Sequence, residues 1–353
     1  MSDKKGSTYS RNEEIRYALK LNEMLDQLPR FCVDYFNSLE FTKQPRTKIA
    51  YAKDIKVFFE YITGSKGSLN GKIIRDLSID DLDSISSDDI SDFLRHCKVY
   101  EKNGSVKTNG ERAIKRKLCS LRGFFGYYYR HGKITSDPSV IVDMPQIHDK
   151  AIIRLEPNEV AELLDNVESG NKLTKAQLRF HNKLKIRDLA LLSLLLGTGI
   201  RVSECVGLDI TDVDFDNARI RVIRKGGAES FVYFGDEVEE TLREYMEERK
   251  HIKTLDENEP ALFISSQGKR LGVRSVEKLV KKYASTVTSV KHITPHKLRS
   301  TYGTNLYQES RDIYLVADVL GHKDVNTTRR HYADQAEENK RKARNIVRLR
   351  TDE

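Results

Sequence analysis

The chain has 353 residues, of which 32% are charged, and its formal net charge is +8. This length is sufficient for two domains that each bury a core, and the positive charge favours an anionic partner such as nucleic acid without proving one. The four cysteines lie far apart with no CxxC pair, which gives no sign of a zinc site and fits reduced thiols inside a cell. The first residues are too polar for a signal peptide, and the longest apolar run, around residues 189–196, is too short to span a bilayer. We therefore expect a soluble, cytoplasmic protein with no membrane partner.

Residues 1–20 begin with a polar stretch that contains Gly and Ser, and they are predicted as a flexible N-terminal tail. Apolar residues then recur at helical spacing up to about Phe41, with a break at Pro29. The next helix is predicted to begin after Pro45 and to end at Gly64. Its apolar stripe consists of Tyr51, Ile55, Phe58, Phe59 and Ile62.

Two further helices complete a first domain over residues 21–143, which we expect to be all helical. Ser86 or Ser87 is suited to cap a short helix that extends through Leu94. After two glycine-containing loops, a long helix is predicted up to about His131. The apolar residues that share one of its faces are Ile114, Leu118, Leu121, Phe125 and Tyr128.

Basic residues occupy the other sides of these predicted helices. Charge on a helix usually forms a solvated face, but several cations on one all-helical domain favour contact with a DNA backbone. The candidate DNA-binding residues are Arg46, Lys53, Lys56, Arg112, Lys115, Arg116 and Arg122.

A linker is predicted over residues 144–154, because Met144-Pro145 stops helical structure and the following stretch has no clear period. A second domain follows over residues 155–336. Its leucine-rich helix over about 184–196 is apolar around most of its circumference and should be buried at the centre. The turn Gly197-Thr198-Gly199 should end that helix and present Arg201 from a rigid support.

The rest of the second domain is predicted to be mainly helical with a small antiparallel sheet. Short alternating runs on both sides of Arg224-Lys225-Gly226-Gly227 indicate a two-stranded hairpin with a Gly-Gly turn. The helices that follow are expected at residues 237–249, 273–284, 297–308, 313–320 and from 327 onward. The whole chain is thus a mainly α protein of two domains.

The second domain contains a set of residues that are jointly rare: Arg201, His296, Arg299, His322 and Tyr332. They stand within Gly197-Thr198-Gly199-Ile200-Arg201, Thr294-Pro295-His296-Lys297-Leu298-Arg299, Leu320-Gly321-His322 and His331-Tyr332. Guanidinium groups bind phosphoryl oxygens in a bidentate way and keep their charge, so two arginines suit a scissile phosphate. A tyrosine can attack that phosphate if a histidine accepts its proton. Isolated residues of these types are usually surface or packing residues, and the surrounding motifs make the functional interpretation stronger.

The order and local sequence of these motifs resemble the tyrosine recombinase (integrase) family, especially its compact Xer-type members. The first domain resembles the family's helical core-binding domain more loosely, through Thr47, Tyr51 and Asp54 and the run 121–125. The resemblance implies a tyrosine-recombinase catalytic domain in the second half of the chain. It also implies DNA strand transfer through a 3′-phosphotyrosine, without ATP, metal or other cofactor.

The resemblance assigns a role to each residue. Arg201 and Arg299 would hold the phosphate, Tyr332 would be the nucleophile, and His296 would accept or shuttle its proton. His322 would hydrogen-bond a phosphoryl oxygen, and Lys225 would be the general acid, with Arg224 as its competitor for that role. The chain departs from the family at Ala228 and Ser230, where relatives have basic residues, and at Ser300, where they often have histidine. Glu204 is expected to brace the site.

The same resemblance implies duplex DNA with an inverted-repeat site as the partner, bound by a homotetramer on two sites. A second recombinase or an accessory protein in that assembly stays open, as does the choice between dimer resolution and mobile-element integration. The basic tail over residues 337–353 is either a solvated terminus or a segment that docks on a neighbouring subunit through Ile346, Val347 and Leu349. Three other functions could use the same residues: a type IB topoisomerase, an architectural DNA-binding protein with a relic site, and a phosphoesterase that acts through phosphotyrosine.

Overall fold

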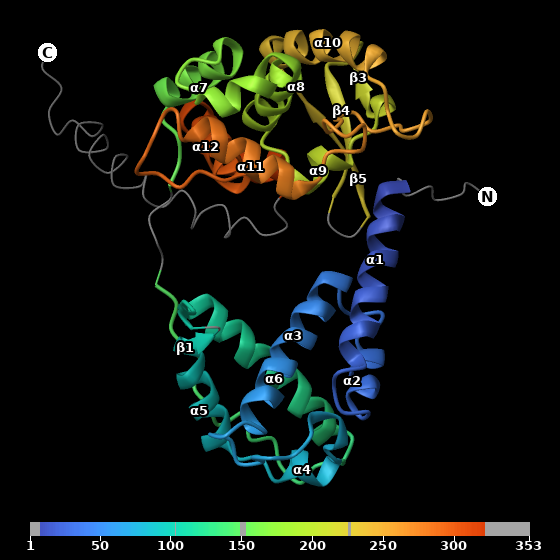
Figure 1. Cartoon of the computed structure of the whole chain (residues 1–353), viewed down its shortest axis with the longest axis vertical. Helices are drawn as coiled ribbons and strands as arrows, with labels where there is room; N and C mark the ends of the chain where they lie inside the picture. The colour runs from blue at the N-terminus through green and yellow to red at the C-terminus, as the bar shows by residue number, and fades with distance from the viewer. Residues whose placement is uncertain (1–7, 103, 149–152, 225–226, 322–353) are drawn as a thin grey trace, which may run out of the picture. The chain divides into compact units, whose positions relative to one another are not determined.

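A computed structural model describes residues 8–102, 104–148, 153–224 and 227–321 (Figure 1). The chain divides into two compact units, Met1–Lys150 and Ala151–Glu353. The division falls within the linker predicted at 144–154. Both units are mostly helical with small antiparallel sheets, which confirms the predicted fold class. In the described residues, no helix is long and apolar enough to cross a membrane.

The first unit is built around two long helices, α3 (Pro45–Ile62) and α6 (Glu111–Arg130), which pack against each other. Pro45 occupies the first turn of α3, where its missing N–H costs no hydrogen bond. Ser86 caps α5 (Ser87–Lys98) by accepting a hydrogen bond from the backbone N–H of Asp89. Of the two predicted caps, Ser86 and Ser87, the first is therefore confirmed. The remaining helices of this unit are α1 (Thr8–Leu25), α2 (Cys32–Ser38), α4 (Ile79–Asp83), α5 (Ser87–Lys98) and the short 3₁₀ helix Ile74–Asp76.

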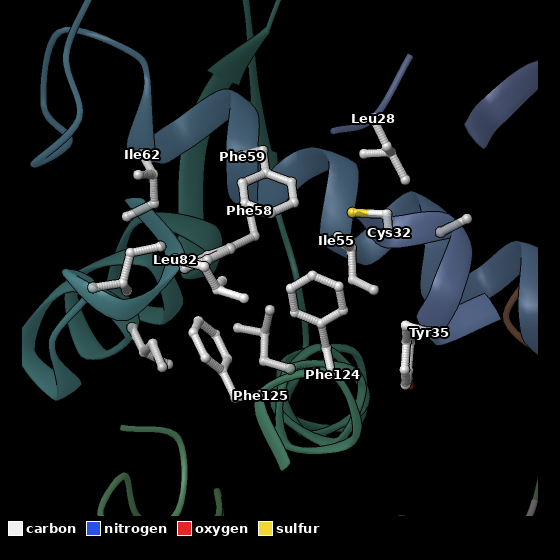
Figure 2. Close-up of a cluster of buried hydrophobic side chains, with 14 of the residues drawn as sticks. Leu28, Cys32, Tyr35, Ile55, Phe58, Phe59, Ile62, Leu82, Phe124 and Phe125 are labelled. Carbon is white, nitrogen blue, oxygen red and sulfur yellow. The ribbon is translucent and has the colours of Figure 1, made fainter. Parts of the chain in front are cut away.

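Aromatic side chains form the centre of this unit's core (Figure 2). Phe58 and Phe59 of α3 face Phe124 and Phe125 of α6, and Tyr35 of α2 packs on the same cluster. The ring pairs Phe59–Phe124 and Phe58–Phe125 meet edge to face, each at an interplanar angle of 80°. Such pairs add about 0.5–1.5 kcal/mol each to the gain from burial. The predicted apolar stripes of both helices therefore form one shared core.

Two predictions for the first unit are wrong. Residues 8–20, expected in a flexible tail, belong to helix α1, because Tyr17 and Leu21 on one face of it pack on the core. The unit is also not all helical, since β1 (Val99–Lys102) and β2 (Ser105–Thr108) form an antiparallel hairpin. Gly104 has a φ of 68°, as a tight hairpin turn requires. The Asn103-Gly104 dipeptide is the sequence signal for that turn.

The second unit is organised around α8 (Lys175–Thr198), which packs against α7, α10 and α12. Residues 190–195 of α8 are all buried, which confirms the predicted central helix. The helix starts about nine residues earlier than predicted, after a capping box in which Thr174 and Gln177 bond each other's backbone. The other helices are α7 (Pro157–Ser169), α9 (Val202–Gly207), α10 (Asp236–His251), α11 (Val273–Ala284), α12 (Pro295–Ser310), α13 (Ile313–Leu320) and the 3₁₀ helix Ile210–Asp212.

The sheet of this unit has three antiparallel strands in the order β3-β4-β5. The predicted hairpin is formed by β4 (Arg219–Ile223) and β5 (Glu229–Tyr233), paired from Arg219 opposite Tyr233 to Ile223 opposite Glu229. The added strand β3 (Val213–Asp214) has only two residues, too short for an alternating pattern to reveal. This sheet and the ends of α8, α12 and α13 support the residues described next.

Candidate active site

Arg201 is held at a sharp turn between α8 and α9. Gly199 ends α8 in the left-handed conformation, with a φ of 62°. A Cβ at this position would lie 2.4 Å from Tyr302 and 3.0 Å from Leu320, so only glycine fits. Ile200 is buried next to it, and Arg201 then begins α9. The predicted rigid support is therefore present, and Gly199 rather than Gly197 ends the helix.

Glu204 is the buried carboxylate that fixes Arg201. It accepts hydrogen bonds from the Arg201 backbone N–H and from Arg201 Nη1, both at 2.8 Å. The Glu204 side chain is 3% exposed, whereas the Arg201 side chain is 36% exposed. The carboxylate thus orients a guanidinium group that still reaches the surface, which is the bracing position expected for Glu204.

Arg299 joins two helix ends that are distant in sequence. It is buried in α12, which begins at Pro295 after the Thr294 cap. Its Nη1 donates to the carbonyl of Gly199 at 2.5 Å, and its Nη2 donates to the carbonyl of Leu320. Cations are favoured at helix C-termini, where backbone carbonyls lack intrahelical partners. Arg299 therefore connects the end of α8, next to Arg201, with the end of α13.

Arg224 is a third arginine in this network. Its Nη1 and Nη2 donate to the carbonyls of Leu320 and Val319, each at 3.2 Å, and Nη1 lies 3.7 Å from Glu204. Burial lowers the pKa of Arg224, while the Glu204 carboxylate raises it and the Arg201 charge lowers it. The Leu320 carbonyl accepts from both Arg224 and Arg299. Three guanidinium groups are thus linked through one carboxylate and the C-terminal end of α13.

Residues 153–339 match the phage integrase family model, which is more than half of the chain. The tyrosine recombinase XerS of Streptococcus agalactiae is 30% identical over 334 residues, covering 88% of this chain and 93% of XerS. The tyrosine recombinase XerC of Caldanaerobacter subterraneus is 30% identical over 317 residues, covering 88% of this chain and 83% of that protein. This chain belongs to the phage integrase family. It is a tyrosine site-specific recombinase, as the motifs predict.

Solved structures share the fold of this recombinase. The XerH site-specific recombinase bound to palindromic difH substrate has a TM-score of 0.62 at 20% identity, over 84% of this chain and 78% of XerH. The Tn1549 transposon integrase in complex with a circular intermediate DNA also has a TM-score of 0.62 at 20% identity. That match covers 88% of this chain and 98% of the integrase. The fold of a recombinase that binds DNA therefore extends over both units.

The structure places three of the predicted catalytic residues of this recombinase. Arg299 donates to the carbonyl of Gly199, and Arg201 follows Gly199 by two residues, with its side chain bonded to Glu204. His296 stands in the first turn of α12, exposed, three residues before Arg299. The other three predicted catalytic residues and the three predicted docking residues lie outside the described residues: Lys225, His322, Tyr332, Ile346, Val347 and Leu349. Ser300, where relatives often have histidine, donates to the His296 carbonyl at 3.1 Å.

Two of the predicted DNA-binding residues, Arg116 and Arg122, interact with other residues of the first unit. Arg116 pairs with the buried Asp54, which also accepts from Lys117 at 3.2 Å and from Ser120 at 2.9 Å. Arg122 donates to three backbone carbonyls, at 3.2, 3.4 and 2.7 Å, those of Ser139, Val140 and Val142. The Arg116 side chain stays 45% exposed beside this carboxylate, and contact of Arg116 and Arg122 with DNA stays a prediction.

The other candidate cations differ in their surroundings. Arg46 donates to Tyr17 Oη at 2.5 Å, and Lys56 donates to Gln27 at 2.5 Å. Arg112 is exposed at the start of α6. Lys53 on α3 is exposed and Lys115 on α6 is half-buried, and neither forms an ion pair with any residue that the structure describes. These two lysines are the best placed of the set for contact with a phosphate.

Proposed function

We propose that this recombinase cuts and rejoins duplex DNA at a specific site by attack of Tyr332 on the scissile phosphate. The observation that supports this most is that Arg299 bonds the carbonyl of Gly199, two residues before Arg201, whose guanidinium is oriented by Glu204. Two neighbouring guanidinium groups, one oriented by Glu204 and one bonded to the turn, can bind the equatorial oxygens of a phosphate while negative charge spreads over them. With Arg224, three guanidinium groups lie near one buried carboxylate among the described residues, that of Glu204. The site is therefore suited to an anion rather than to a neutral substrate.

The residues of this chain supply the nucleophile, the proton acceptor and the proton donor that the chemical step needs. The Tyr332 hydroxyl oxygen forms a bond to phosphorus, the bond from phosphorus to the 5′-oxygen breaks, and a 3′-phosphotyrosine results. His296 accepts the phenol proton, and Lys225 donates a proton to the leaving 5′-oxygen. His322 donates a hydrogen bond to a phosphoryl oxygen. Attack by another strand's 5′-hydroxyl reverses these steps, so religation needs no nucleotide hydrolysis.

Of the two competitors for the general acid, Lys225 is the better candidate. The Arg224 guanidinium is 12% exposed and donates to the end of α13, so its hydrogen bonds are committed to the protein. Arginine also keeps its proton at any pH at which proteins fold, which makes it a poor proton donor. An ammonium group on the neighbouring turn residue can lose a proton far more readily.

The first unit is proposed to hold the DNA backbone through Lys53 and Lys115, together with the exposed Arg112. The wider assembly is proposed as a homotetramer on two inverted-repeat sites. The apolar residues of the basic tail, Ile346, Val347 and Leu349, would dock on the neighbouring subunit. Truncation after Ala336 should then spare single-site binding in a gel shift and abolish recombination of paired sites. A loose electrostatic tail would instead lower affinity alone, and normal recombination would contradict both roles.

The proposed chemistry is tested by trapping the covalent intermediate. The DNA beside the coding region supplies candidate sites as short inverted repeats around a spacer, and a nicked version of such a site prevents religation. Wild-type protein should accumulate a protein–DNA adduct, and a peptide map of that adduct should place the DNA on Tyr332. Tyr332→Phe should bind the same site and give no adduct. An adduct formed by the phenylalanine variant would assign the nucleophile to another residue.

A further inference from the structure

Arg224 is located at the base of the turn that joins β4 to β5. Its backbone N–H donates to the Ala228 carbonyl at 2.8 Å, and its carbonyl accepts from the Gly227 N–H at 3.0 Å. Gly227 has a φ of 83°, as expected for the left-handed position of a short hairpin loop. The backbone of Arg224 thus closes the loop to which Lys225 belongs.

The side chain of the same residue attaches this turn to α13. Its two terminal nitrogens donate to consecutive carbonyls, those of Val319 and Leu320, each at 3.2 Å. The last carbonyls of a helix lack intrahelical donors, and the negative end of the helix dipole favours a cation there. A guanidinium fork can bond two carbonyls at once, which fixes both the distance and the orientation of the turn.

Gly321 leaves room for this contact because it has no side chain. It ends α13 in the left-handed conformation, with a φ of 60°. A Cβ at Gly321 would lie 2.9 Å from both Cζ and Nη1 of Arg224, too close for a real side chain. Arg224 and Gly321 are therefore in direct contact, and the next residue along the chain from each is a predicted catalytic residue: Lys225 and His322.

We infer that Arg224 is a positioning residue, which fixes the turn bearing Lys225 against the end of α13 so that the lysine reaches the leaving 5′-oxygen. This inference rests on the proposed function, in which Lys225 is the general acid. Arg224 also approaches Glu204 to 3.7 Å, so it ties the turn to the carboxylate that orients Arg201. One side chain thus places the proton donor relative to both the phosphate-binding arginine and the helix end that precedes His322.

The test compares cleavage of ordinary DNA with cleavage of DNA that has a 5′-bridging phosphorothiolate, whose sulfur leaves without a proton. Arg224→Met should slow cleavage of ordinary DNA by about 10-fold or more, because small misplacements of a reacting group are costly. The phosphorothiolate should restore both Arg224→Met and Lys225→Ala. The double variant should cleave ordinary DNA no more slowly than Lys225→Ala alone, because both changes remove the same function.

Two further variants serve as controls. Arg221→Met removes an arginine of β4, the strand that precedes Arg224. Arg221 pairs with Asp212 at 2.7 Å and Glu229 at 3.4 Å, and the variant should cleave both substrates at the wild-type rate. Arg224→Lys retains the charge but replaces the fork by a single ammonium, so its rate should lie between those of wild type and Arg224→Met. If Arg224→Met fails to fold in a thermal melt, Arg224→Lys is compared on the two substrates in its place.

The outcomes separate the inference from the function on which it rests. Rescue of Lys225→Ala without rescue of the Arg224 variant overturns the inference and leaves the general acid in place. Full activity of Arg224→Met on ordinary DNA overturns it as well. Failure to rescue Lys225→Ala overturns the assignment of the general acid, and the inference with it. Rescue of both variants, with no additional loss in the double variant, supports the inference.

Discussion

The two units contain the same local arrangement, a buried carboxylate between one half-exposed arginine and one buried cation. In the first unit, Asp54 binds Arg116 and Lys117, with side chains 45% and 10% exposed. In the second, Glu204 binds Arg201 and approaches Arg224, with side chains 36% and 12% exposed. Burial and charge alone would therefore not distinguish a structural cluster from a catalytic one.

The difference lies in how the remaining hydrogen-bonding capacity is used. Asp54 receives a third donor from Ser120, and Arg116 also donates to the Ala50 carbonyl at 3.3 Å, so the cluster is directed at the packing of α3 against α6. Around Glu204 the arginines lie where secondary-structure elements end. Arg201 follows the end of α8, and Arg224 lies at the β4–β5 turn and donates to the end of α13. The ends of helices leave carbonyls without intrahelical donors, and the arginines that bond them lie where a phosphate can approach, whereas the Asp54 cluster lies between two packed helices. We therefore expect the first cluster to affect stability and the second to affect cleavage.

The largest effect should come from Asp54→Asn. The substitution keeps the size of the side chain and leaves Lys117 buried without its anionic partner, which typically costs about 3–5 kcal/mol. Urea unfolding of the full chain should show this loss, while cleavage per folded molecule stays at the wild-type level. Glu204→Gln is the matched change in the second unit. It should destabilise less, because Arg201 reaches water, and should slow cleavage. A cleavage defect in Asp54→Asn would remove the distinction between the clusters.

The next effect concerns the arginines themselves. Arg201→Ala and Arg299→Ala remove donors to a charge that develops in the transition state, so each should slow cleavage by about 10²–10³. Arg116→Ala removes the equivalent arginine of the first unit and should leave the rate on saturated DNA nearly unchanged. Single-turnover cleavage of a nicked site measures all three variants. Equal loss in Arg116→Ala would show that the first cluster also acts in the chemical step.

The sequence predicted the helices of this protein better than the partners of its cations. The bounds of α11 and α13 are the predicted ones, because amphipathic periodicity and capping are local signals. Spacing assigns Arg116 and Arg122 only to faces of their own helix and does not indicate what they bond. Their partners, Asp54 and the carbonyls of residues 139–142, come from other segments. Long-range contacts of this kind leave no periodic trace in a sequence.

The signal for the two candidate active-site arginines is of a different kind. Arg201 and Arg299 are embedded in long motifs that specify the glycine turn and the helix start around them. Arg224 was recognised only as a competitor of Lys225, since nothing in its immediate sequence indicates the α13 carbonyls 95 and 96 residues away. The catalytic roles of all six residues stay predictions: Arg201, Lys225, His296, Arg299, His322 and Tyr332.

A smaller effect is expected at Arg122. Its guanidinium donates to three carbonyls in the segment that follows α6. A hydrogen bond that involves a charged group contributes about 1.5–3 kcal/mol to the free energy of unfolding. Arg122→Ala should therefore lower stability by about 2 kcal/mol. Denaturation of the free protein measures this. Unchanged stability with weaker DNA binding would show that Arg122 contacts a phosphate rather than stabilising the protein.

The smallest effect should appear at Lys53, which has no ion-pair partner among the described residues and is exposed on α3. Lys53→Ala should leave stability unchanged and reduce the slope of log affinity against log salt by about 0.9, the value for one phosphate contact. Arg122→Ala should leave that slope unchanged, provided that both are measured on the same single-site DNA. The pair thus separates a cation that contacts DNA from one that stabilises the protein. A slope that changes only in Arg122→Ala would mean that internal hydrogen bonds in the free protein are exchanged for phosphate contacts on binding.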